Sequence, residues 1–116
     1  MSGHGHRQAA LLVDATAWRD RVIDDARGEG RAAARAQEVS IDLVIAMIEI
    51  IAAYMAAGES EISRTDLKMS GVRSVPLIGT RQTQRLLRYL EDRGHIGRTD
   101  NRDLIRPVRG DELPLR

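Results

Sequence analysis

The sequence has no cysteine and no phenylalanine, and its only aromatic residues are Trp18, Tyr54 and Tyr89. Without cysteine the chain forms neither a disulfide framework nor a zinc site with cysteine ligands. Leu, Ile, Val, Met and Ala must fill the interior, and this composition suits helices better than sheets. There is no signal-peptide pattern at the N-terminus, so we expect a cytoplasmic protein of one domain.

The net charge of the whole chain is only +1, so neither sign of charge is in large excess. The two halves differ, however. Residues 1–62 carry six arginines against ten acidic residues, whereas residues 63–116 carry eleven arginines and one lysine against seven acidic residues. A basic half built on arginine suits a phosphate-rich partner, because guanidinium groups bind phosphate oxygens in pairs and also read guanine edges.

The first seven residues, MSGHGHR, predict a disordered tail. Its histidines, His4 and His6, are too few to form a metal site, so no metal is expected. Residues 8–40 then form an N-terminal helical segment. A narrow apolar seam runs along its first helix through Leu11, Ala15, Trp18 and Val22. Such a seam packs on the chain's own core or pairs with a second copy, and it is the best candidate for a homodimer interface.

Residues 41–57 are apolar at nearly every position, which predicts a helix enclosed on several sides at the centre of the fold. A membrane span is not expected, because Asp42 and Glu49 would lie inside the bilayer. These two acidic residues share one face with Glu38 and are interpreted as a solvated seam. No Lys or His lies at helical spacing to tune them as a catalytic pair, and His95 is the only histidine outside the tail. We therefore expect neither an enzyme nor a cofactor.

The basic half begins with a short strand at residues 61–63. Ser63 then caps a helix over residues 63–70, in which Leu67 faces the core. Residues 71–79 follow as a long loop containing Pro76, with Val75, Leu77 or Ile78 turned inward.

A second helix is predicted from Arg81 to Arg93, capped by Thr80 and stopped by Gly94. One face carries Leu86 and Leu90, and the opposite face carries a row of arginines. Residues 95–99 and 102–108 form a hairpin about a two-residue connection, Asp100-Asn101.

This order of elements resembles the winged helix-turn-helix domain of bacterial transcription regulators such as the MarR and PadR families. Leu86, Leu90, Gly94 and Ile96 match the end of the recognition helix and the start of the wing in those families. The resemblance covers residues 41–108. It implies a mainly α fold with a small β-hairpin, in which a winged helix-turn-helix domain over residues 41–109 follows an N-terminal amphipathic helix and precedes a tail over residues 110–116. The loop at 71–79 is about twice as long as the usual turn.

The resemblance further implies that the helix from Arg81 reads the major groove of double-stranded DNA and that the wing contacts phosphates. The expected function is that of a small, nucleoid-associated transcriptional regulator. The predicted DNA-binding residues are Arg81, Gln82, Gln84, Arg85, Arg88, Arg98, Arg102, Arg64, Lys68 and Arg73. Two alternatives stay open. In the first, the domain is a protein-interaction subunit of a larger assembly and has an exposed apolar patch around Trp18. In the second, the domain senses an effector that binds beside the long core helix.

Overall fold

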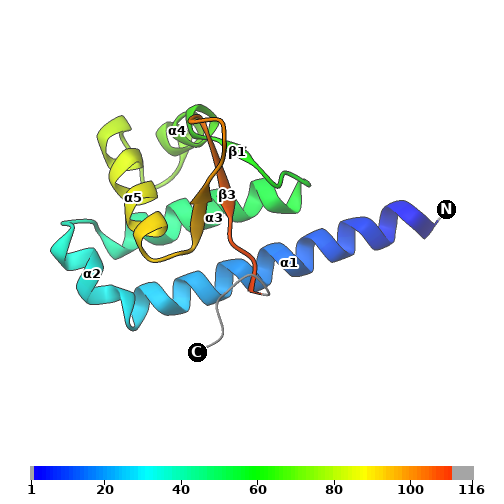
Figure 1. The fold of residues 1–116 in the computed structure, drawn as a ribbon, viewed down its shortest axis with the longest axis horizontal. Coiled ribbons are helices and arrows are strands. Elements are labelled where there is room, and N and C mark those ends of the chain that lie inside the picture. The colour runs from blue at the N-terminus through cyan, green and yellow to red at the C-terminus, as the bar shows by residue number, and fades with distance from the viewer. Residues whose placement is uncertain (1, 111–116) are drawn as a thin grey trace.

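The computed structural model describes the chain over residues 2–110, with side chains from Arg7 onward. This part of the protein is mainly helical, with a small three-stranded antiparallel sheet, as the sequence predicted. The elements in chain order are α1 (Ser2–Arg27), α2 (Gly30–Ala36), α3 (Ile41–Ala56), β1 (Ile62–Ser63), α4 (Arg64–Arg73), α5 (Thr80–Asp92), β2 (Ile96–Arg98) and β3 (Leu104–Pro107). In Figure 1, α1 lies on one side of α3, while α4, α5 and the turn of the β2–β3 hairpin lie together on the other side.

Helix α1 packs along α3 through the apolar seam seen in the sequence. Trp18 and Val22 are fully buried in the same core as Met47 and Ile51 of α3. The helix begins at Ser2, so the prediction of a disordered start over residues 1–7 is wrong from Ser2 onward. The side chains of His4 and His6 lie outside the described residues, as does the tail from residue 111. The N-terminal segment and the basic half share one core.

Helix α3 is the central helix that its composition predicted. Val44, Ile48 and Ile51 are fully buried, because α1 covers one side of the helix and α4 and α5 cover another. Asp42 and Glu49 are exposed, which confirms the solvated seam. Over residues 2–110, no single helix is long and apolar enough to cross a membrane.

Helix α4 starts as predicted and ends later. The Ser63 hydroxyl accepts a hydrogen bond from the Asp66 backbone N–H and caps the helix. The helix continues to Arg73, so the loop before α5 comprises residues 74–79. One of the three apolar candidates turns inward as expected: Ile78 is buried, whereas Val75 and Leu77 are exposed.

Helix α5 is displaced by one residue from its predicted bounds. Gly79 takes the N-cap position instead of Thr80, and its N–H donates to the side-chain oxygen of Gln82. At the other end Gly94 has a φ of +79°, and the His95 N–H bonds back to the carbonyl of Leu90. This left-handed residue after the helix is the stop that the sequence indicated, since glycine has no Cβ to oppose it.

The sheet has the order β1-β3-β2, with Ile62 paired to Ile105 and Arg98 also paired to Ile105 from the other side. The predicted two-residue connection of the hairpin is wrong, because residues 99–103 all lie between the strands. The longer turn has a physical cause. The Asn101 side chain accepts from the Asp103 N–H, and the Asp103 carboxylate accepts from Ser63 at the start of α4.

Candidate nucleic-acid interface

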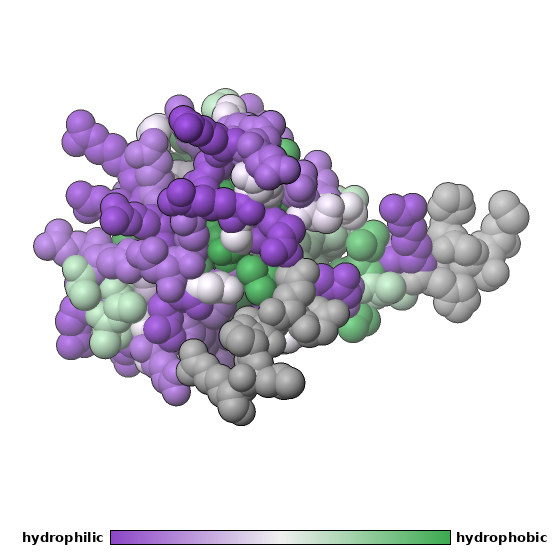
Figure 2. Space-filling model, viewed as in Figure 1, coloured by the Kyte–Doolittle hydropathy of each residue, from purple (hydrophilic) through white to green (hydrophobic). Residues whose placement is uncertain are grey.

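Helix α5 has two chemically distinct faces. Its inner face buries Leu86, Leu87 and Leu90 in the core. Its outer face carries five exposed polar or basic side chains, Arg81, Gln82, Gln84, Arg85 and Arg88. The helical spacing of leucines and arginines in the sequence predicted this division. Figure 2 shows that the surface over α4, α5 and the hairpin is predominantly hydrophilic.

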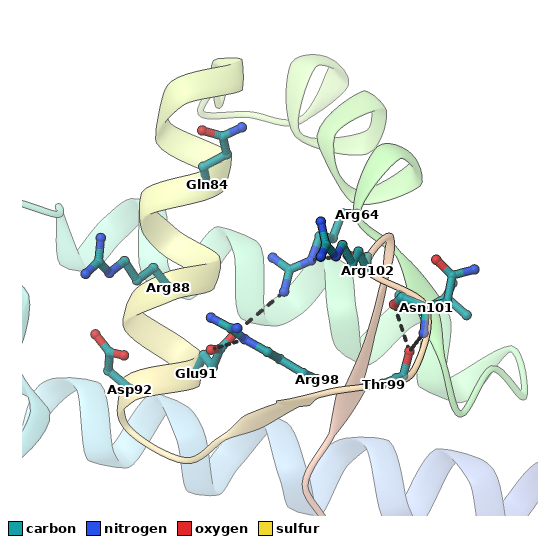
Figure 3. A pocket seen from close by; sticks show the side chains of 10 residues that line it. Arg64, Gln84, Arg88, Glu91, Asp92, Arg98, Thr99, Asn101 and Arg102 are labelled. Carbon is teal, nitrogen blue, oxygen red and sulfur yellow. Dashed lines mark hydrogen bonds and ion pairs between the residues drawn. The ribbon is translucent and has the colours of Figure 1, made fainter.

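A groove of about 760 Å³ runs between α5, the start of α4 and the β2–β3 hairpin. Figure 3 shows the lining side chains on these three elements, with Arg64 and Arg98 directed toward Glu91. Four of the predicted DNA-binding arginines line the groove, together with one predicted glutamine: Arg64, Arg88, Arg98, Arg102 and Gln84. Residues up to 38 positions apart in the chain therefore form one basic surface.

Glu91 ties the three elements of the groove together. One of its carboxylate oxygens lies 2.7 Å from Nε of Arg98 on β2, and the other lies 3.5 Å from an Nη atom of Arg64 on α4. Both guanidinium groups line the groove, one from the hairpin and one from α4. Glu91 therefore orients both guanidinium groups and also competes with any anion that enters the groove.

A second carboxylate fixes the turn of the hairpin against α4. Asp103 accepts hydrogen bonds from the hydroxyls of Ser63, at 2.6 Å, and Thr65, at 3.0 Å, and these bonds hold its pKa below the ordinary value. The Arg64 N–H donates to the Asp103 carbonyl, and the Arg64 side chain donates to the carbonyl of Arg102. The arginine-bearing turn is thus held in place by contacts within the chain.

A partly buried ionic cluster connects α1 to the base of the hairpin. Asp25 of α1 accepts two bonds from Arg93, at 2.6 and 3.0 Å, and lies 2.7 Å from Nε2 of His95. The hydrogen bond from Arg93, reinforced by His95, lowers the pKa of Asp25. Burial lowers the pKa of His95, and Asp25 offsets only part of this effect. Trp18 adds a hydrogen bond from its indole N–H to the His95 carbonyl, so α1 positions the first residues of the hairpin.

The remaining predicted site residues lie around the groove. Arg85 borders a second hollow, which it shares with Arg88 and the end of α2. Arg73 and Arg81 are exposed at the ends of the α4–α5 loop, and Lys68 is half-buried on α4. Gln82 is also exposed, but its side-chain oxygen is engaged at the start of α5.

The side chains predicted to form a dimer interface pack largely inside the chain's own fold. Ala15, Trp18 and Val22 are buried, and Leu11 is half-buried. Trp18 and Val22 therefore have the other of the two roles that the sequence left open for this seam, which is packing on the chain's own core. Trp18 is only 1% exposed, so it does not itself offer the exposed apolar surface that the interaction-subunit alternative expected. A homodimer itself stays a prediction.

Comparison with protein-family models, with curated proteins and with solved structures gives no match to this chain. The site therefore has to be understood from its own residues. Sequence reasoning missed the organising roles of Glu91, Asp103 and Asp25. The seven-residue spacing between Glu91 and Arg98, across Gly94, is a signal that could have indicated the first of them.

Proposed function

We propose that this chain is a winged helix-turn-helix protein that binds double-stranded DNA and regulates transcription. In this proposal α5 enters the major groove, and the β2–β3 hairpin is the wing that lies along the phosphate backbone. The order α3, β1, α4, α5 and hairpin supports this assignment, as does the antiparallel pairing of β1 with β3.

The observation that carries the proposal is the set of arginines exposed on α5 and in the groove beside it, where four arginines outnumber the two acidic residues Glu91 and Asp92. Gln84, Arg85 and Arg88 are exposed on one helix, and arginine and glutamine are the side chains that pair with guanine and adenine edges. Across the groove, Arg98 and Arg102 lie where a phosphate backbone following the helix would pass. An open groove with guanidinium groups from three elements fits an extended polyanion better than a small ligand.

The affinity of the chain for duplex DNA should fall steeply with salt. If five to seven arginines each neutralise a phosphate, log Kd against log salt should have a slope of about 4.5 to 6, so affinity drops about 10³-fold between 50 and 200 mM salt. Fluorescence anisotropy of a labelled duplex measures this directly. Absence of binding at about 50 mM salt, where non-specific phosphate contacts persist, would overturn the proposal in favour of the protein-interaction subunit.

Replacing Glu91 with glutamine should tighten duplex binding about three- to tenfold at low salt, because it removes a negative charge from the floor of the groove and releases two guanidinium groups. The variant also loses the ion pair that orients Arg98. This loss should weaken binding only slightly, since the Arg98 side chain is already 80% exposed. Glu49→Gln, on the exposed seam of α3, makes the same change in net charge and should leave affinity unchanged. Weaker binding by the Glu91 variant would mean that Glu91 acts only by positioning Arg64 and Arg98.

A further inference from the structure

The segment from Met69 to Leu77 exposes an unusual amount of apolar surface. Six large hydrophobic side chains are exposed in the part of the chain whose side chains are described, and four of them lie in this segment: Met69, Val72, Val75 and Leu77. Val75 is 95% exposed and Leu77 is 70% exposed. Exposed apolar side chains gathered in this way mark a contact surface.

The loop that carries Val75 and Leu77 is held in a defined shape. The Ser74 hydroxyl lies 2.8 Å from the carbonyl of Gly71 and 2.7 Å from that of Pro76, and the Ile78 N–H donates to the Gly71 carbonyl. Ile78 is fully buried, and a Cβ on Gly71 would approach it to 3.2 Å. With Ser74 and Ile78 both fixed, the two apolar side chains between them project from a braced loop.

The charged residues that flank this loop in the sequence are all basic. From Leu67 to Leu90 the sequence contains no acidic residue and five basic ones. Arg73 is exposed at the end of α4, immediately before the loop, and Arg81 is exposed in the first turn of α5, immediately after it. The apolar tip is thus flanked by cations and is continuous with the basic face of α5.

We propose that Val75 and Leu77 insert against the base pairs at the edge of the DNA site that α5 reads, and that they bend the duplex there. This inference rests on the proposed DNA binding. Apolar wedges that unstack a base step are a known means of bending DNA, and cations beside the wedge hold the flanking phosphates. Flanking segments that carry basic and no acidic residues favour DNA over a protein surface, where acidic and basic groups are interspersed. Pyrimidine–purine steps such as TA should be preferred, because they open most easily.

The test compares duplexes of about 20–30 base pairs that carry donor and acceptor dyes at their ends and either a TA or a GC step at the centre. Wild-type protein should shorten the end-to-end distance and bind the TA duplex about fivefold more tightly. The Val75→Ser/Leu77→Ser variant should lose both effects and retain the salt dependence that comes from the arginines. Both side chains are exposed, so the thermal unfolding of the variant should match the wild type. Leu12→Ser/Val13→Ser removes two exposed apolar side chains from α1, at 59% and 66% exposure, and should change neither bending nor step preference.

The outcomes separate this inference from the proposed function. Salt-dependent binding without bending, or bending that the Val75/Leu77 variant retains, overturns the wedge and leaves DNA binding intact. In that case the apolar surface serves a protein partner. Failure of the wild type to bind any duplex at low salt overturns both proposals together.

Discussion

Replacing both Arg85 and Arg88 with alanine is expected to weaken duplex binding about 100-fold at low salt, because each contact to a base edge or a phosphate contributes about 1–3 kcal/mol. Both side chains are exposed on α5, so their removal should not disturb the core formed by the opposite face. The slope of log Kd against log salt should also decrease by about 2 if both contacts are to phosphates. Fluorescence anisotropy across a salt series measures both quantities.

A matched control is available on the other side of the molecule. Arg7 is exposed on α1, about five helical turns before Asp25, where that helix contacts Arg93 at the end of α5. The Arg7→Ala variant has the same net charge as the Arg85→Ala variant. It should bind within about twofold of the wild type, since charges beyond a Debye length of ~10 Å are largely screened. Equal losses in the two variants would mean that binding depends on net charge alone and not on α5.

Replacing Asp25 with alanine is expected to lower the free energy of unfolding by about 2–4 kcal/mol. Removing one partner of a buried ion pair costs about 3–5 kcal/mol, and the partial exposure of this cluster reduces that figure. The Asp25 side chain is only 17% exposed, so the pair is largely shielded from water. Its removal leaves the Arg93 guanidinium without its carboxylate and the His95 ring without its partner. Urea denaturation followed by circular dichroism gives the value.

Asp20→Ala provides the comparison for this second prediction. Asp20 lies on the same helix and pairs with its neighbour Arg19, but its side chain is 65% exposed. Exposed pairs contribute about 0–1 kcal/mol, so this variant should unfold close to the wild type. If the Asp25 variant were equally stable, α1 would not be held to the hairpin through this cluster.

The core of the fold was predictable from the sequence because its signals are local. The Leu86 and Leu90 face of α5, the Ser63 cap of α4 and the Gly94 stop each depend on residues within about one turn of helix. The apolar run of α3 identified the central helix for the same reason. The order of these elements then gave the mainly α fold with its small hairpin.

The errors arise where contacts distant in sequence decide the structure. The hairpin turn spans residues 99–103 instead of two residues, because Asp103 is bonded to Ser63 and Thr65, about 40 positions earlier. The seam on α1 was consistent with a dimer or with the chain's own core, and helical periodicity cannot distinguish a partner in the same chain from one in another.

The candidate site, like the fold, was predictable from the sequence only where its signals are local. The arginines of α5 were found from their spacing, which is a property of one helix. The groove required the placement of α4 and the hairpin beside that helix. The ion pairs of Glu91 to Arg64 and Arg98 make it the residue that joins the walls of the groove, a role that the sequence did not predict. Such a role depends on tertiary geometry and leaves little trace in a single sequence.

The most direct test of the central claim is the ¹⁵N–¹H NMR spectrum of the full chain, titrated with a duplex at low salt. A protein of 12.9 kDa is well suited to it. Binding by α5 and the hairpin predicts that the amide shifts concentrate in residues 81–88 and 98–102, while the amides of residues 8–20 on α1 stay in place. Shifts concentrated on α1 or α2, or no shifts at all, would contradict the proposal that α5 and the hairpin form a DNA-binding surface.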